Sequence, residues 1–249
     1  MFADEIKATY MLHIPHSSTN LAGYESDFHD NLTLHSEIAK CTDWMTDSIF
    51  DPTVLGLPAV VCFVSRIICD VERLLENEPM EAAGRGVIYK LDRHGKELRK
   101  QVSGNPIEEF YKPHHSKLTE LCTSLLQEHG VCRIVDCHSF NDKPLPYEAD
   151  QTSARPDICL GVDDFHTPHF MTHYFRKFFK DLGLSVEVNT VYSGTIVPLQ
   201  YLNNNPKVQS IMIEVNKRLY MNDNGIVDYV RTKVLQDMMK KLFEFEVAI

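Results

Sequence analysis

The stretch Ile134-Val-Asp-Cys-His-Ser-Phe140 passes from β-branched apolar residues to an acid, a histidine and a hydroxyl within a few positions. Such an apolar run predicts a buried central strand of an α/β sheet. Sheets of this kind bind their ligands just beyond the carboxyl ends of the strands. We therefore expect Asp136, His138 and Ser139 to lie at a functional edge of the sheet. The alternative for His138 is a capped or hydrogen-bonded loop histidine.

The segments around this stretch alternate between strand and helix patterns. An amphipathic helix is predicted over 106–129 and leads directly into the strand. Further strand-like runs cover 8–14, 59–73, 156–164, 184–188 and 208–218, and helical runs cover 32–50 in pieces, 169–182 and 225 to about 245. Strands that alternate with helices indicate parallel pairing. The predicted fold class is α/β, in a single domain over residues 1–249.

Length and composition agree with one soluble domain. With 249 residues, of which 43% are hydrophobic and 24% charged, the chain can bury one substantial core. The formal net charge of −10 argues against a nucleic-acid surface, which needs a basic footprint. The first residues lack a basic and apolar leader, and no apolar run reaches about 18 residues, so we expect a cytoplasmic protein without a membrane partner.

The seven cysteines lie mostly inside apolar runs, and no two of them form a C-x-x-C pair. Their number is odd, which also argues against a disulfide framework. This pattern is typical of reduced core residues rather than of disulfides or a zinc knuckle.

Histidines follow the first predicted strand. His16 lies beside small hydroxyl residues after Pro15 ends the strand, and a metal-ligand role fits the room that an open catalytic site needs. The His13 side chain need not point to the same side as that of His16, and we interpret His13 as a packed or partly exposed histidine. His114 and His115 point to different sides of the predicted helix. We interpret them as packed or solvated, with a contact to substrate or to a site residue as the alternative.

Two aspartates, Asp43 and Asp47, lie four residues apart in the broken helical segment 32–50. For Asp47, a favourable interaction with the positive end of a helix dipole is a sufficient explanation. The Trp44 side chain beside Asp43 indicates that this carboxylate is partly buried. A buried carboxylate needs a cation, and a metal is one candidate.

Charged residues also interrupt two other apolar runs. One delivers Arg66, Asp70 and Arg73, which form either internal ion pairs or a guanidinium site for a carboxylate or an oxyanion. The other contains Glu214, which is either in a salt bridge with Arg218 or a neighbouring residue, or a general base with a pKa tuned toward neutrality. After the first run, the charged and Gly-containing region 76–99 predicts a surface loop over the site.

Six short motifs, in order, resemble the N-formylglutamate amidohydrolase family from about residue 8 to 245. They are Ile14-Pro-His-Ser17, Thr42-Asp-Trp44, Ser65-Arg66 with Asp70-Val-Glu-Arg73, Asp136-Cys-His-Ser139, Ser193-Gly-Thr195, and Ile213-Glu-Val-Asn216 with Tyr220-Met221. The family is similar in fold to the zinc carboxypeptidases and aspartoacylase-type deacylases. The resemblance implies a phosphorylase/hydrolase-like three-layer α/β/α unit with a mixed, largely parallel sheet, which removes formate from N-formyl-L-glutamate in histidine breakdown.

The resemblance also implies one zinc ion per chain, at the strand ends. His16 and His138 would be ligands, and Asp43 would supply the carboxylate ligand, with Asp47 as its substitute. Asp136 would orient a ligand rather than bind the metal. Two imidazoles and one carboxylate leave zinc an open position, where the pKa of water falls to about 7.

The same resemblance implies how an N-acyl amino acid substrate would be bound and cleaved. Glu214 would be the general base and then the general acid, and Arg66 would steady the tetrahedral oxyanion or the substrate carboxylate. Substrate-binding roles fall on Arg73, Ser139, Gly194 and Thr195.

Three positions depart from the usual family pattern. Glu72 stands where asparagine is usual, Ser193 replaces the first glycine of a common pair, and Thr195 replaces a frequent histidine. These residues fall near the expected pocket, so the acyl group or the amino acid can differ, as in a deacylase or carboxypeptidase acting on another amide. Two other classes stay open: a metal-free binding protein on this fold, and a serine hydrolase using Ser139, which lacks the usual G-x-S-x-G elbow.

Overall fold

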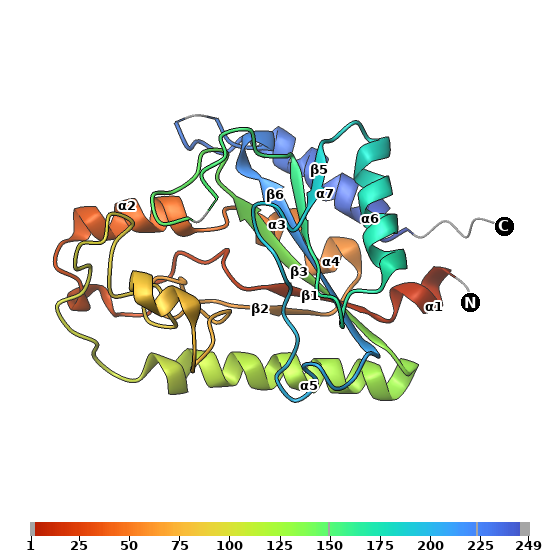
Figure 1. Ribbon diagram of the computed structural model, residues 1–249, viewed down its shortest axis with the longest axis horizontal. Coiled ribbons are helices and arrows are strands. Elements are labelled where there is room, and N and C mark those ends of the chain that lie inside the picture. Colours follow the sequence, from red (N-terminus) through yellow and green to blue (C-terminus); the bar gives the residue numbers. More distant parts are fainter. Residues whose placement is uncertain (1–2, 149, 223, 245–249) are drawn as a thin grey trace.

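A six-stranded sheet forms the centre of the computed structural model, which describes residues 3–148, 150–222 and 224–244 (Figure 1). The strand order is β2-β1-β3-β6-β4-β5. The strands span Tyr10–Ile14 (β1), Ala59–Val61 (β2), Cys132–Phe140 (β3), Ile158–Gly161 (β4), Val186–Val188 (β5) and Val208–Asn216 (β6). β4 is antiparallel to β6 and the other pairs are parallel, so the prediction of a mixed, largely parallel sheet is confirmed.

Two predicted strand limits are wrong. β2 ends at Val61, and the chain then leaves the sheet in turns, although the prediction extended the strand to 73. Val64 and Ile67 are fully buried all the same, because they pack into an apolar cluster outside the sheet. β3, in contrast, continues past His138 and pairs with β6 as far as Phe140. The polar residues predicted beyond its end therefore lie within the strand.

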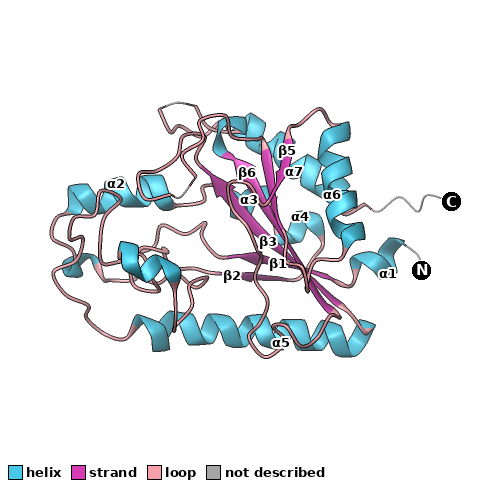
Figure 2. Cartoon of the chain, in the orientation of Figure 1, coloured by secondary structure: helices cyan, strands magenta, loops and turns pink. Residues whose placement is uncertain are grey.

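Helices cover both faces of the sheet, which confirms the three-layer prediction (Figures 1 and 2). The long helix α5 runs along one face, and α3, α4, α6 and α7 cover the other. The helices span Ala3–Lys7 (α1), Asn31–Cys41 (α2), Thr46–Ile49 (α3), Pro52–Leu55 (α4), Lys112–His129 (α5), His169–Asp181 (α6) and Tyr229–Leu242 (α7). The predicted end of the last helix, at about 245, lies outside the described residues. Within the described part of the chain, none of these helices has the length and apolar character needed to cross a membrane.

Side-chain alternation divides the strand residues between the two faces of the sheet. Leu12, Val135 and Ile213 belong to the apolar cluster that packs against α6 and α7. Met11 and Ile134 point to the other face and pack with α5. Along each strand, residues that face α6 and α7 therefore alternate with residues that face α5.

The polar residues of the central strands point to the face of the sheet that α5 covers. His13 lies two residues after Met11 in β1, and Asp136 and His138 follow Ile134 at even spacing in β3. Glu214 in β6 is opposite His138, and Asp136 is opposite His13. The sheet therefore brings these four side chains to one face, near the carboxyl ends of three adjacent parallel strands.

The segments before and after β2 extend the molecule beyond the carboxyl ends of β1 and β3 (Figure 1). A buried ion pair stabilises this extension: Glu37 of α2 is 1% exposed and accepts hydrogen bonds from Arg85 and Arg93. The Arg85 side chain is itself 1% exposed. Removal of Glu37 would therefore leave a buried guanidinium without its carboxylate.

We predict that Glu37→Ala lowers the free energy of unfolding by about 3–5 kcal/mol, the usual result of breaking a buried ion pair on one side. Urea denaturation followed by circular dichroism measures this change. Glu108→Ala is the matched control, because Glu108 pairs with Lys112 on an exposed helix surface and should change the stability by less than about 1 kcal/mol. Equal effects of the two substitutions would contradict the structural role of Glu37.

Candidate active site

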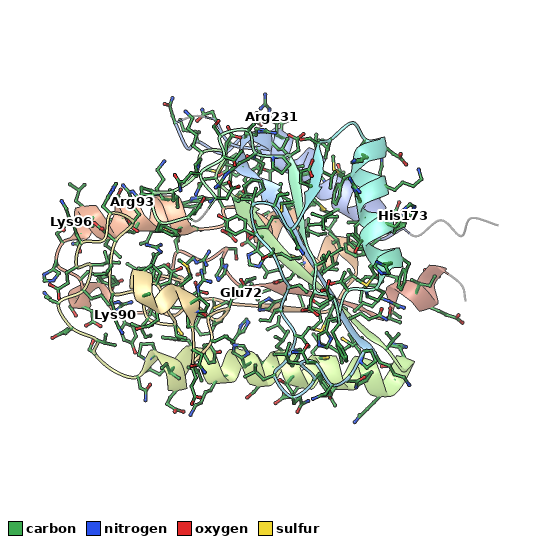
Figure 3. The ribbon with its side chains drawn as sticks, viewed as in Figure 1. Glu72, Lys90, Arg93, Lys96, His173 and Arg231 are labelled. Carbon is green, nitrogen blue, oxygen red and sulfur yellow. The ribbon has the colours of Figure 1, made fainter. Side chains whose placement is uncertain are left out.

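A cavity of about 660 Å³ lies where β1, β3 and β6 end. Its wall combines histidines, carboxylates and cations from segments far apart in the sequence. Those with chemical relevance are His16, Asp43, Arg66, Glu72, Arg73, Asp136, His138, Glu214 and Lys217. Figure 3 shows Glu72 near the middle of the molecule, whereas Arg93 and Lys96 lie at its periphery.

His16 follows β1 and is held by a carboxylate through one ring nitrogen. Its Nε2 lies 2.8 Å from Oδ1 of Asp70, and both side chains are almost fully buried. The other ring nitrogen, Nδ1, is buried, has no hydrogen-bond partner within the described part of the chain, and lies 3.5 Å from Oε2 of Glu72. The peptide N–H of Glu72 donates to Asp70, so one carboxylate fixes both the histidine and the backbone of the glutamate.

His138 repeats this arrangement from β3. Its Nδ1 lies 3.0 Å from Oδ2 of Asp43, and its Nε2 lies 3.1 Å from Oε1 of Glu72. The peptide N–H of Asp43 donates to the backbone oxygen of His16, which ties the two histidine-bearing segments together. Metal-binding histidines commonly have one nitrogen held by a carboxylate and the other turned to the metal.

The donor atoms of His16, Glu72 and His138 lie within 4.8 Å of one another and could hold a metal ion. Two imidazoles with one carboxylate is a donor set that zinc accepts in open catalytic sites. The unpartnered Nδ1 of His16 fits such an ion, because a buried polar atom without a partner is costly. Sequence reasoning missed Glu72 as a donor; its departure from the family pattern, next to the predicted pocket, was the available signal.

Asp43 lies beside both predicted histidine ligands. Its Oδ2 is 3.0 Å from Nδ1 of His138 and 3.7 Å from Nδ1 of His16. Asp47, the substitute for Asp43, is exposed on α3 and is not part of the cavity wall. The cavity thus excludes Asp47 as a ligand, while Asp43 is close enough to bind or to orient the histidines.

The charges in the cavity stabilise one another. Burial alone would raise the pKa of Asp43, but the hydrogen bond with His138 and the nearby His16 ring hold it well below its ordinary value. Burial alone would lower the pKa of His138, but the carboxylates of Glu72 and Asp136 raise it well above its ordinary value. A cation is therefore strongly favoured between these carboxylates.

Glu214 is the one carboxylate here whose pKa rises. It is 6% exposed, and its Oε2 has no hydrogen-bond partner among the described residues. Burial is the largest effect and raises its pKa to about 8, with the negative charges of Asp43 and Glu72 acting in the same direction and the charge of His138 opposing them. The predicted salt bridge to Arg218 is wrong, since Arg218 pairs with other carboxylates.

The two predicted arginines contact the same aspartate. Arg66 donates through Nη2 and Nε to Oδ2 of Asp70, at 2.8 and 3.2 Å, and Tyr89 donates to the same oxygen. Nε of Arg73 lies 3.5 Å from that oxygen without forming a hydrogen bond. Both guanidinium groups line the cavity. Internal ion pairs therefore orient these arginines, and the pairing is compatible with a binding role.

Lys217 is a cation that the sequence interpretation did not single out. It follows β6 immediately, is 6% exposed, and donates to the side-chain oxygen of Asn141 at 3.2 Å. Burial lowers its pKa, while the charge of Asp43 acts in the opposite direction. A buried ammonium group in the cavity wall is a candidate contact for a negatively charged ligand.

The other predicted contact residues occupy different places. Gly194 has a φ of +80° in a loop that lines the cavity, and nearby Thr195 hydrogen-bonds to Ser210 at 2.7 Å. Ser139 borders the cavity, but alternation along β3 directs its side chain to the opposite face, beside the core residue Val215. The hydroxyl of Ser139 is thus turned away from the ring of His138, which argues against a serine nucleophile.

His13 is fully buried, in agreement with the packed interpretation, and it has two titratable partners. Its Nδ1 lies 2.8 Å from Oδ1 of Asp136, and its Nε2 lies 2.8 Å from Nε2 of His114. Burial, followed by the charge of His13, lowers the pKa of His114 to about 2, so this ring is neutral. His115, the next residue, instead hydrogen-bonds to the backbone oxygen of Val71.

Residues 8–221 match the model of the family described as N-formylglutamate amidohydrolase. The chain belongs to the N-formylglutamate amidohydrolase family. It is therefore assigned to the hydrolases that act on an amide bond, which confirms the resemblance drawn from the six motifs. No curated protein sequence matches this chain.

Solved structures share the fold. A crystal structure of N-formylglutamate amidohydrolase from Ralstonia eutropha JMP134 matches with a TM-score of 0.81 and 18% identity, covering 94% of this chain and 91% of that one. A gene product from Agrobacterium tumefaciens matches with a TM-score of 0.66 and 16% identity, covering 95% of this chain and 92% of that one. Nearly the whole described sheet and its helices are thus common to the three proteins.

Proposed function

We propose that this N-formylglutamate amidohydrolase family member is a zinc-dependent enzyme that cleaves the amide of an N-formyl or other N-acyl amino acid. The family supplies the reaction class. One observation supports the binding of zinc. His16 and His138 each contact a carboxylate through one ring nitrogen and turn the other nitrogen toward Glu72. N-formyl-L-glutamate is the first substrate to test.

His16, His138 and Glu72 would hold the zinc ion. Asp43, the carboxylate ligand predicted from the sequence, contacts Nδ1 of His138, whose other nitrogen faces Glu72. We therefore give Asp43 the role of orienting His138, as buried carboxylates do behind metal-binding histidines. When bound, zinc would polarise the amide carbonyl and make water a better nucleophile near neutral pH.

Glu214 would move the protons. Its buried carboxyl group has a raised pKa, which makes it a better proton acceptor than an ordinary glutamate. As a base it would take a proton from the attacking water, and as an acid it would return this proton to the departing amine. The position of Glu214 opposite His138 in the β3–β6 register supports this assignment.

Three cations would bind the negative parts of the substrate. Arg66 is held near Asp43, with Nη1 4.0 Å from Oδ1, so we assign it to the developing oxyanion of the amide. Arg73 and Lys217 would bind the carboxylates of the amino acid, with the Gly194–Thr195 loop as part of the pocket wall. Guanidinium and ammonium groups recognise carboxylates through charge-assisted hydrogen bonds.

A direct assay tests the function. Protein is stripped with a chelator, reloaded with zinc, and incubated with N-formyl-L-glutamate and a panel of N-formyl and N-acetyl amino acids, and amine release is measured. Hydrolysis that needs the metal supports the proposal. Zinc binding without hydrolysis of any panel member would contradict the amidohydrolase assignment, and hydrolysis that survives complete metal removal would contradict the zinc.

We predict that Lys217→Met raises KM for a carboxylated substrate about 10–100-fold with little change in kcat, because a charge-assisted hydrogen bond contributes about 1.5–3 kcal/mol. The same substrate with its carboxylates blocked as amides should show no such difference. Lys143→Met, at an exposed lysine outside the cavity wall, is the control. An equal loss with charged and blocked substrates would show that Lys217 supports the fold rather than the carboxylate.

A further inference from the structure

A second group of possible donors lies directly beside the first. His13, Glu72 and Asp136 offer one atom each within 4.8 Å of one another. Nδ1 of His13 is 2.8 Å from Oδ1 of Asp136 and 3.7 Å from Oε1 of Glu72. His13 is fully buried and Asp136 is 1% exposed, while the Glu72 side chain is 17% exposed. One nitrogen and two carboxylate oxygens thus meet beside the cavity, whose wall includes Glu72 and Asp136.

Glu72 belongs to both groups. Its Oε2 lies 3.5 Å from Nδ1 of His16, and its Oε1 lies 3.1 Å from Nε2 of His138 and 3.7 Å from Nδ1 of His13. A carboxylate whose oxygens contact the donors of both groups is suited to bridge two metal ions.

The charges around the second group are not balanced by lysine or arginine. Among the described residues, the ion-pair partners of Glu72 and Asp136 are all histidines: His13, His16 and His138. Buried carboxylates need a positive charge nearby or a full set of hydrogen bonds. If His16 and His138 bind one metal through their lone pairs, they no longer supply protons to these oxygens.

The partner on the far side of His13 is compatible with metal binding. Its Nε2 lies 2.8 Å from Nε2 of His114, so one of these nitrogens must carry the hydrogen and the other must accept it. When His13 is the donor, its Nδ1 turns a lone pair toward Asp136 and Glu72. A lone pair among carboxylate oxygens requires a cation between them.

We propose that the site holds two divalent cations, the second bound by His13, Asp136 and Glu72, with Glu72 bridging both. This inference rests on the proposed function for the first ion and adds a second to it. It gives Asp136 and His13 ligand roles in place of the orienting and packing roles expected from the sequence. The neighbouring cation would favour carboxylate binding by reducing the negative charge of the cavity.

Metal stoichiometry tests the proposal without an activity measurement. Wild-type protein, His13→Gln and His16→Gln are stripped with a chelator and titrated with Zn²⁺ alone, and bound zinc per chain is counted by native mass spectrometry. The expected counts are two for the wild type and one for each variant. Asp136→Asn, which keeps the shape of the side chain, should also bind one ion and covers the case that His13→Gln does not fold.

Each of the other results of this titration contradicts a specific part of the proposal. One zinc in the wild type that His16→Gln loses and His13→Gln keeps would remove the second site and leave the proposed function intact. One zinc that only His13→Gln loses would move the single metal to the second group, and two zinc ions retained by all variants would refute the ligand assignment. No zinc in the folded wild type would refute both the second site and the proposed function.

Discussion

Glu214→Gln should lower kcat by about 10²–10⁴-fold, the range that general acid–base catalysis usually contributes. Gln has the shape of Glu but cannot take up a proton, so the zinc content and the fold should stay unchanged. The wild-type kcat/KM should rise with pH as Glu214 deprotonates. Burial raises its pKa to about 8, and a bound cation would move this rise to lower pH. Steady-state kinetics across this range, with metal analysis of the same samples, makes the measurement.

The matched control is Glu187→Gln, at an exposed glutamate in the edge strand β5. It should leave the activity and its pH dependence as in the wild type. A Glu214→Gln enzyme that keeps both kcat and the rise with pH would assign the proton transfer to another group. A variant that loses its zinc would instead make Glu214 part of the metal site.

His138→Ala should abolish metal-dependent hydrolysis to the limit of detection and remove the metal that His16 and Glu72 share with it. The ring of His138 contacts Asp43, Glu72 and Asp136 and separates three carboxylates. Its loss removes one donor and also brings like charges closer together. Metal analysis and amine release, measured on the same preparation, test both effects.

His173→Ala is the control for this experiment, because His173 is an exposed histidine on the outer side of α6 (Figure 3). It should keep wild-type metal content and activity. A His138→Ala protein that stays folded and binds zinc with unchanged affinity would refute the metal site proposed around this residue. Circular dichroism separates that case from simple loss of the fold.

The strands were predictable where the hydrophobicity of the residues and their periodicity both indicate a strand. β1, β3 and β6 have apolar residues on both faces, and the predicted order of strands and helices was correct from β1 onward, although helix α1 was not predicted. The run after Val61 misled the prediction, because Val64 and Ile67 are buried by loops rather than by a sheet. Hydrophobic composition indicates that a segment is buried, but it does not distinguish burial within a sheet from burial by loops.

The site was predictable in its histidines and less so in its carboxylates. His16 follows β1 and His138 lies near the carboxyl end of β3, so local sequence places them at the correct edge of the sheet. Glu72 reaches the cavity because a turn fixed by Asp70 returns the chain to the sheet, which is a tertiary event. The contact between His13 and Asp136 depends on the register of β1 with β3, and two strands separated by more than a hundred residues do not reveal their register locally.

Glu72 lies in a different kind of segment from the residues that surround it in the site. His13, Asp136 and His138 belong to central strands, whose backbone amides are expected to exchange with solvent only when the whole domain opens. Glu72 belongs to a turn outside the sheet, which the buried Asp70 carboxylate holds through its hydrogen bond with the Glu72 peptide N–H. A metal bound as proposed would therefore depend on two separate supports: the central strand that carries His138, and the single carboxylate that fixes the turn of Glu72.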